Sequence, residues 1–168
     1  MTTHVLFDGV PGVIVRSRDV VIEGVGLDEV VRAAVRAAES ADRIELCGGM
    51  PVEVAARVRE AISSDVDVRV NRYGFESLEQ VAAYKAAFAT GEAGDAAFFY
   101  SAAESTPLER HDGVLVAGIA DENDLAARVR EAHARGAGIV ELYGGLGISA
   151  AAVARAACAH ELPVGFID

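Results

Sequence analysis

Apolar and polar positions follow the same order twice along the chain. In the first half, apolar runs at 5–7 and 20–25 predict buried strands, separated by a loop with proline and glycine. The segment 30–38 predicts a helix, because its apolar side chains recur on one helical face. A third strand at 44–47, a second helix and a fourth strand at 66–70 complete this half.

The second half repeats this arrangement. Apolar runs at 97–100 and 114–119 predict two strands, and Leu125, Val129 and Ala132 share one face of the helix that follows. A strand around 140–143, another helix and a last strand at 162–167 end the series. Because strands and helices alternate through short links, we expect mostly parallel sheets with right-handed crossovers.

The two halves also share a sequence motif. IELCGG at 44–49 recurs as VELYGG at 140–145, and the ungapped match runs from 45–72 against 141–168. Identical pairs include Glu45/Glu141, Leu46/Leu142, Gly48/Gly144, Gly49/Gly145, Arg59/Arg155 and Val68/Val164. We therefore assign 1–75 to a first repeat, 76–95 to a connecting helix and 96–168 to a second repeat, within one compact domain.

These repeats predict an α/β protein with two pseudo-symmetric units. Eight strands in two equivalent sets can close into a small TIM-like barrel or remain two packed open sheets. The barrel is favoured, because two small open sheets would each expose edges. The short links between first and second strands favour the open sheets, as does the length of the chain, since a full barrel of this type needs about 200 residues or more.

Charge limits the partners of the protein. Its formal charge is −11, and 15 basic residues are scattered among 26 acidic ones, so neither nucleic acid nor an anionic membrane is an expected partner. The sequence has no apolar run long enough for a membrane span and no signal peptide at the N-terminus, which predicts a cytoplasmic protein. The two cysteines are expected to be free thiols.

The repeated glutamates, Glu45 and Glu141, are the main candidates for catalysis. Each lies between apolar neighbours in a predicted strand, where a carboxylate is unfavourable unless it is paired or hydrated. The functional interpretation places both across one polar cavity as acid and base. The structural interpretation pairs each with an arginine, such as Arg69 or Arg155.

Other polar residues are candidates for substrate binding. Arg69 and Asn71 alternate with the apolar positions of the fourth strand, as does Tyr73, and Tyr143 follows Glu141 on the same side of its strand. Arginine and asparagine on one side of a cavity would suit a small anionic or carbonyl-bearing molecule. The alternative for Arg69 and Asn71 is an exposed polar face on an edge strand.

The paired glycines, Gly48–Gly49 and Gly144–Gly145, stand between a strand and a helix. Glycine permits a sharp turn, and free amides at a helix start attract phosphate or carboxylate, which makes these four glycines candidates for substrate binding. The alternative is that the pairs serve only to form the turns. Cys47 is expected to be a buried, inert thiol, because Tyr143 replaces it in the other repeat. No histidine spacing indicates a metal site, and no cofactor is predicted.

The IELCGG segment and its surroundings resemble a group of small bacterial proteins, about one repeat long, that form a domain family of unknown function. This resemblance implies a fold unit and no activity. The stretch ending in RIEL also resembles, more distantly, the part of keto-deoxy-phosphogluconate-type aldolases that carries a catalytic glutamate, which would be Glu45. Lys85 is the single lysine and lies on a predicted helix, so a Schiff-base mechanism lacks its residue.

The sequence thus leaves three hypotheses about function. The first is a small-molecule enzyme of carbonyl or enol chemistry, an isomerase or lyase, with Glu45 and Glu141 as its acid and base. The second is a binding module that holds a small anionic metabolite without catalysis. The third is a structural assembly protein, and self-association into a homo-oligomer fits any of them.

Overall fold

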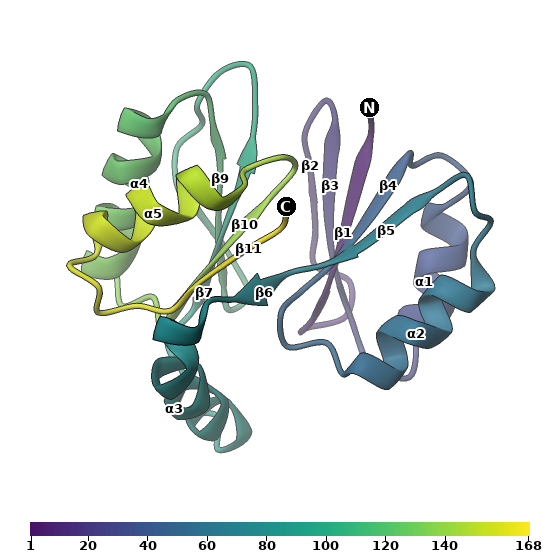
Figure 1. The fold of residues 1–168 in the computed structure, drawn as a ribbon, viewed down its shortest axis with the longest axis horizontal. Coiled ribbons are helices and arrows are strands. Elements are labelled where there is room, and N and C mark those ends of the chain that lie inside the picture. The colour runs from purple at the N-terminus through teal and green to yellow at the C-terminus, as the bar shows by residue number, and fades with distance from the viewer. The chain divides into compact units, whose positions relative to one another are not determined.

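The computed structural model describes residues 1–168, which form two compact units, Met1–Asn71 and Arg72–Asp168. Each unit is a mixed sheet with helices (Figure 1). The expected connecting segment, 76–95, belongs to the second unit. Every helix is either too short or too polar to span a lipid bilayer.

The first unit contains a five-stranded sheet in the order β2-β3-β1-β4-β5. Its elements in chain order are β1 (Thr3–Asp8), β2 (Ile14–Arg16), β3 (Val20–Val25), α1 (Val30–Ala37), β4 (Arg43–Leu46), α2 (Val52–Ala61) and β5 (Asp67–Val70). The strands are parallel except for β2, which forms an antiparallel hairpin with β3.

The second unit contains a six-stranded sheet in the order β6-β11-β10-β7-β9-β8. Its elements are β6 (Arg72–Tyr73), the 3-10 helix η1 (Phe75–Ser77), α3 (Leu78–Ala89), β7 (Ala96–Ser101), β8 (Glu109–His111), β9 (Val114–Ile119), α4 (Glu122–Ala134), β10 (Ile139–Tyr143), α5 (Ile148–Ala157) and β11 (Val164–Phe166). The edge strands β6 and β8 are antiparallel to their neighbours.

The strand orders of the two sheets are equivalent. Read from its β8 edge, the second sheet runs β8-β9-β7-β10-β11, which matches β2-β3-β1-β4-β5, and β6 is added beyond β11. The strands that carry the repeated motif, β4 and β10, occupy the same place in both. The repeat in sequence is therefore accompanied by a repeat of topology.

The favoured closed barrel does not form, because the strands belong to two separate open sheets. The loop segments after β1 and β7 contribute the short strands β2 and β8, which end their sheets antiparallel to β3 and β9. Short edge strands of this kind limit the exposed backbone groups of an open sheet. The mixed α/β class was predicted correctly, and the preference for the barrel was wrong.

Alternation along the strands separates two faces of each sheet. In the second unit, Val140 and Leu142 of β10 pack with Leu125 and Val129 of α4 in one buried cluster, so Glu141 lies on the face away from these helices. In the first unit, Leu6 and Leu46 are in register with each other, and both are completely buried. Figure 1 shows α1 and α2 along one face of their sheet, and α4 and α5 along one face of theirs.

Candidate functional site

Glu141 is held by two tyrosines on the face of the second sheet that points away from α4. The Tyr73 hydroxyl donates to Glu141 Oε1, and the Tyr143 hydroxyl donates to Glu141 Oε2. Glu141 is 3% exposed and Tyr143 is completely buried, whereas Tyr73 is half-buried. Two phenol donors can stabilise a buried carboxylate that would otherwise be costly to desolvate.

The sheet register explains how these three residues meet. Tyr143 is two residues beyond Glu141 on β10, so both side chains leave the same face. Glu141 is in register with Gly165 of β11, and Gly165 is in register with Tyr73 of β6. Because Gly165 has no side chain, the Tyr73 side chain can reach across β11 to Glu141. Phe98 packs edge-on against Tyr143, with ring centroids 5.5 Å apart, and fixes that ring.

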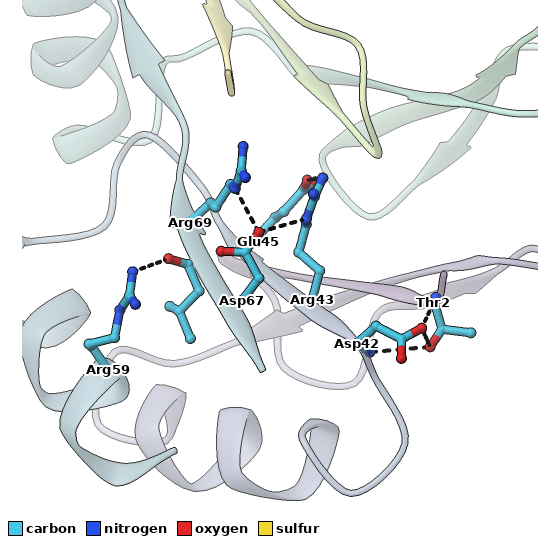
Figure 2. A network of polar contacts seen from close by, with 8 residues as sticks. Thr2, Asp42, Arg43, Glu45, Arg59, Asp67 and Arg69 are labelled. Carbon is cyan, nitrogen blue, oxygen red and sulfur yellow. Dashed lines mark hydrogen bonds and ion pairs between the residues drawn. The ribbon is translucent and has the colours of Figure 1, made fainter. Parts of the chain in front are cut away.

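Glu45 has a different environment in the first unit (Figure 2). Its carboxylate is completely buried, and Arg43 Nη1 lies 3.5 Å from its Oε1 atom. Arg43 Nε also lies 3.2 Å from Asp67 Oδ2, and Arg69 Nε binds the same oxygen at 2.7 Å. Glu45 is therefore ion-paired in this unit, with two arginines and two carboxylates in one network.

The arginine that pairs with Glu45 differs from those expected. The sequence suggested Arg69 or Arg155, but Arg69 binds Asp67, and Arg155 binds Ser77 Oγ at 2.8 Å and lies 3.9 Å from Glu76. Arg43 lies two residues before Glu45 on β4, so their side chains share a face. Glu45 therefore pairs with an arginine that the sequence analysis did not name.

Arg69, Asn71 and Tyr73, which the sequence analysis placed on one side of the fourth strand, have different environments in the structure. Arg69 lies on β5 and its side chain is 36% exposed. Asn71 is completely buried, and its backbone N–H donates to the Leu46 carbonyl at 2.8 Å, so the expected exposed edge position is wrong for this residue. Tyr73 belongs to β6 in the sheet of the second unit.

Glu45 and Glu141 belong to different units, and their use of one cavity stays a prediction. Within each unit, both occupy the predicted buried position of the motif strand. Sequence reasoning missed Arg43 and Asp67, and it gave Tyr73 no role beside Glu141. Two sequence features pointed to these contacts: Arg43 stands two residues before Glu45, and position 165 is a glycine. Their meaning became clear only from the strand register, which places Gly165 between Glu141 and Tyr73.

The glycine pairs differ between the repeats. Gly144 and Gly145 have φ values of 61° and 97°, in the left-handed region that favours glycine, whereas Gly48 and Gly49 are outside it. At the start of α5, the Ile148 amide donates to Asp168 Oδ1 at 3.1 Å. A carboxylate of the chain itself therefore already occupies this helix start, and another anion would have to displace it.

His4 lies on the opposite face of the first sheet from Glu45. Its Nε2 atom is 2.9 Å from Glu23 Oε2, and Glu23 also lies 3.6 Å from Arg36 of α1. Burial lowers the pKa of His4 below its usual 6.5, and the hydrogen bond to Glu23 opposes this effect. Burial raises the pKa of Asp8.

The cysteines and the possible metal ligands do not form another candidate site. Cys47 and Cys158 are both buried and form no disulfide, and the Asp8 backbone amide donates to Cys47 Sγ at 3.5 Å. No group of three or more histidine, cysteine, aspartate or glutamate side chains could hold a metal ion.

Comparison with known proteins gives a match to one family over part of the chain. A family described as a family of unknown function (DUF6506) matches residues 15–86, which extend from β2 into α3. No curated protein matches the chain. The resemblance to aldolases is not supported by these comparisons. Over residues 15–86, the chain is thus similar to this family of unknown function.

Proposed function

We propose that the chain is a small-molecule enzyme of carbonyl or enol chemistry, an isomerase or lyase, with Glu141 as its principal proton-transfer group and Glu45 as a second one. The observation that carries this proposal is the Glu141 carboxylate held between the hydroxyls of Tyr73 and Tyr143. A carboxylate beside a phenol supplies both a base and an acid for proton transfer.

The chemistry follows from these two groups. Glu141 takes a proton from the carbon beside the substrate carbonyl, and the electrons of the broken C–H bond form a carbon–carbon double bond. The carbonyl oxygen gains the charge, which a tyrosine hydroxyl stabilises by donating a hydrogen bond or its proton. Return of the proton to another carbon gives isomerisation, and loss of a leaving group from the neighbouring carbon gives elimination.

Tyr73 is the better candidate for contact with the substrate oxygen. It is half-buried and comes from the two-residue edge strand β6, whereas Tyr143 is completely buried and fixed by Phe98. A substrate carbonyl can then replace Glu141 as the acceptor of the Tyr73 hydroxyl. Tyr143 keeps its hydrogen bond to Glu141 and orients the base.

The test is exchange of carbon-bound hydrogen with solvent. A panel of 2-oxo acids and hydroxyketones is incubated with the protein in D2O, and proton NMR follows the loss of the signal beside the carbonyl. We expect exchange with at least one compound, and we expect Glu141→Gln to slow it by at least about 100-fold. Glu45→Gln tests the second glutamate in the same assay.

Glu23→Gln is the matched control, because Glu23 is a part-buried strand glutamate that pairs with His4. It should leave the exchange rate unchanged. Absence of exchange with the whole panel, or equal rates for wild type and Glu141→Gln, would refute the proposal.

A second candidate function, binding of a small anion, is favoured by Arg69. Arg69 binds Asp67 through Nε, which leaves the outer nitrogens of its guanidinium available, and its side chain is 36% exposed. An arginine fork of this kind suits a carboxylate or phosphate. Calorimetric titration with inorganic phosphate and with succinate should show binding that Arg69→Gln removes and that Arg57→Gln, on the exposed surface of α2, retains. Binding unaffected by Arg69→Gln would exclude this site.

A further inference from the structure

A fully exposed phenylalanine stands next to an apolar hollow in the second unit. Phe75 in η1 is 91% exposed, which is the largest exposure among the large hydrophobic residues. Single exposed apolar residues are common on protein surfaces, but a large aromatic side chain has much apolar area to bury. The neighbours of Phe75 on both sides, Gly74 and Glu76, line the hollow.

This open hollow, which we call the α5 hollow, has a volume of about 390 Å³. Its apolar walls come from α5 and β11, and the residues that form them are Ile148, Ala151, Ala152, Val164 and Phe166. The volume lies within the range of about 300–1,000 Å³ that is usual for binding pockets and is sufficient for an aromatic ring. The small alanines of α5 create this space.

The rim of the α5 hollow is held in place by polar contacts. Arg155 lies 3.9 Å from Glu76 and donates to Ser77 Oγ at 2.8 Å. The Gln80 side chain donates to the His160 carbonyl at 2.7 Å, which ties the start of α3 to the loop after α5. These contacts fix η1 against α5, so Phe75 and the hollow keep a constant relation within this unit.

We infer that the α5 hollow receives Phe75 of a second copy of this chain, in a symmetric homodimer. An apolar projection and an apolar hollow on one patch are self-complementary, because a twofold axis at their shared rim places each Phe75 in the hollow of the other copy. When the two features lie on distant surfaces, the same contact does not close and gives open chains of molecules. Phe75 and the α5 hollow are adjacent, because Gly74 and Glu76 line the hollow, and this adjacency favours a closed dimer.

The test measures the molar mass of the full chain by sedimentation equilibrium over a concentration series. We expect a monomer–dimer equilibrium for the wild type. Phe75→Ala should raise the dissociation constant of the dimer by at least about 100-fold, because the interface contains this aromatic anchor twice.

A second variant tests the hollow itself. Ala152→Phe fills the hollow from its own chain and should weaken the dimer as strongly as Phe75→Ala does. Phe88→Ala is the matched control, since Phe88 is 52% exposed on α3 and does not line the hollow, and it should leave the dissociation constant unchanged. Far-ultraviolet circular dichroism checks that each variant is folded.

Three outcomes would overturn the inference. The first is a wild-type chain that stays monomeric throughout the series. The second is a dimer that survives Phe75→Ala or Ala152→Phe. The third is a molar mass that keeps growing with concentration, which indicates an open assembly in place of the closed pair.

Discussion

At the scale of single residues, the carboxylates of Glu45 and Glu141 show how one repeated position acquires different partners. Both are buried strand residues at equivalent places, yet an arginine pairs with the first and two tyrosines bind the second. The register gives one reason. The neighbour of Glu45 on β5 is Arg69, whereas the neighbour of Glu141 on β11 is Gly165. The sequence predicted the glutamates, because they interrupt apolar runs, but it did not predict their partners.

Removing the Tyr143 hydroxyl should destabilise the protein. Glu141 is 3% exposed, so water cannot easily replace a lost donor, and a hydrogen bond to a buried charged group is worth about 1.5–3 kcal/mol. We expect Tyr143→Phe to lower the free energy of unfolding by about 2 kcal/mol in urea denaturation. Tyr73→Phe should have a smaller effect, because the half-buried site admits water.

Tyr84→Phe is the control for this prediction. The Tyr84 hydroxyl lies 3.4 Å from the Gly94 carbonyl in an exposed position, so its loss should change the free energy of unfolding very little. Equal effects of Tyr84→Phe and Tyr143→Phe on the free energy of unfolding would mean that the buried hydrogen bond to Glu141 contributes no more stability than the exposed one.

His4 should make stability depend on pH. Its pKa in the folded chain is below the value of 6.5 in the unfolded chain, so between these two values the unfolded chain binds more protons. The free energy of unfolding therefore falls as the pH drops through the window just below 6.5, by at most about 1.4 kcal/mol per pH unit.

The measurement compares urea denaturation of the wild type and His4→Gln on both sides of that window. Glutamine does not titrate but can still donate to Glu23, so the difference between the two proteins isolates the histidine. Parallel pH profiles for both proteins would contradict the lowered pKa of His4.

At the scale of secondary-structure elements, the strand-to-helix turns of the two repeats provide a matched comparison. Gly145 has a φ of 97°, where an L side chain is strained, whereas Gly49 is outside the positive-φ region. A Cβ added to Gly49 would meet only the Cys47 sulfur, at 4.0 Å. The Gly-Gly dipeptide thus adopts different backbone conformations in the two repeats.

We expect Gly145→Ala to destabilise the protein by about 1–2 kcal/mol, because alanine in the left-handed region clashes with its own backbone. Gly49→Ala should be close to neutral or slightly stabilising. Thermal unfolding of both variants checks this difference, and a loss at Gly49 as large as that at Gly145 would show that the turns are more alike than their φ angles indicate.

Periodicity predicted the main strands and helices well and the edges of the sheets poorly. The buried strands β1, β3, β7 and β9 contain the apolar runs identified from sequence. The strands β2, β6 and β8 have two or three residues each, too few for alternation to be recognised. Tyr73 was assigned to the wrong strand for this reason, since β6 is a separate strand one residue after β5.

At the scale of the whole molecule, charge sets the expected partners. The protein has 26 acidic and 15 basic residues, and its formal charge of −11 repels polyanions. We expect no binding to duplex DNA by fluorescence anisotropy at physiological salt. The protein should likewise not co-sediment with vesicles that contain anionic lipid. Salt-sensitive binding in either assay would reveal a local basic surface that the total charge conceals.

The sequence by itself determined the alternation of strands and helices, the equivalence of the two halves and the burial of both motif glutamates. These features depend on local periodicity and on the unfavourable transfer of a carboxylate to an apolar strand, which the order of residues records directly. The tertiary structure decided that the strands form two open sheets, and it decided which side chains reach Glu45 and Glu141. Those outcomes depend on hydrogen-bond register between strands distant in sequence, and the pattern within one strand does not contain that register.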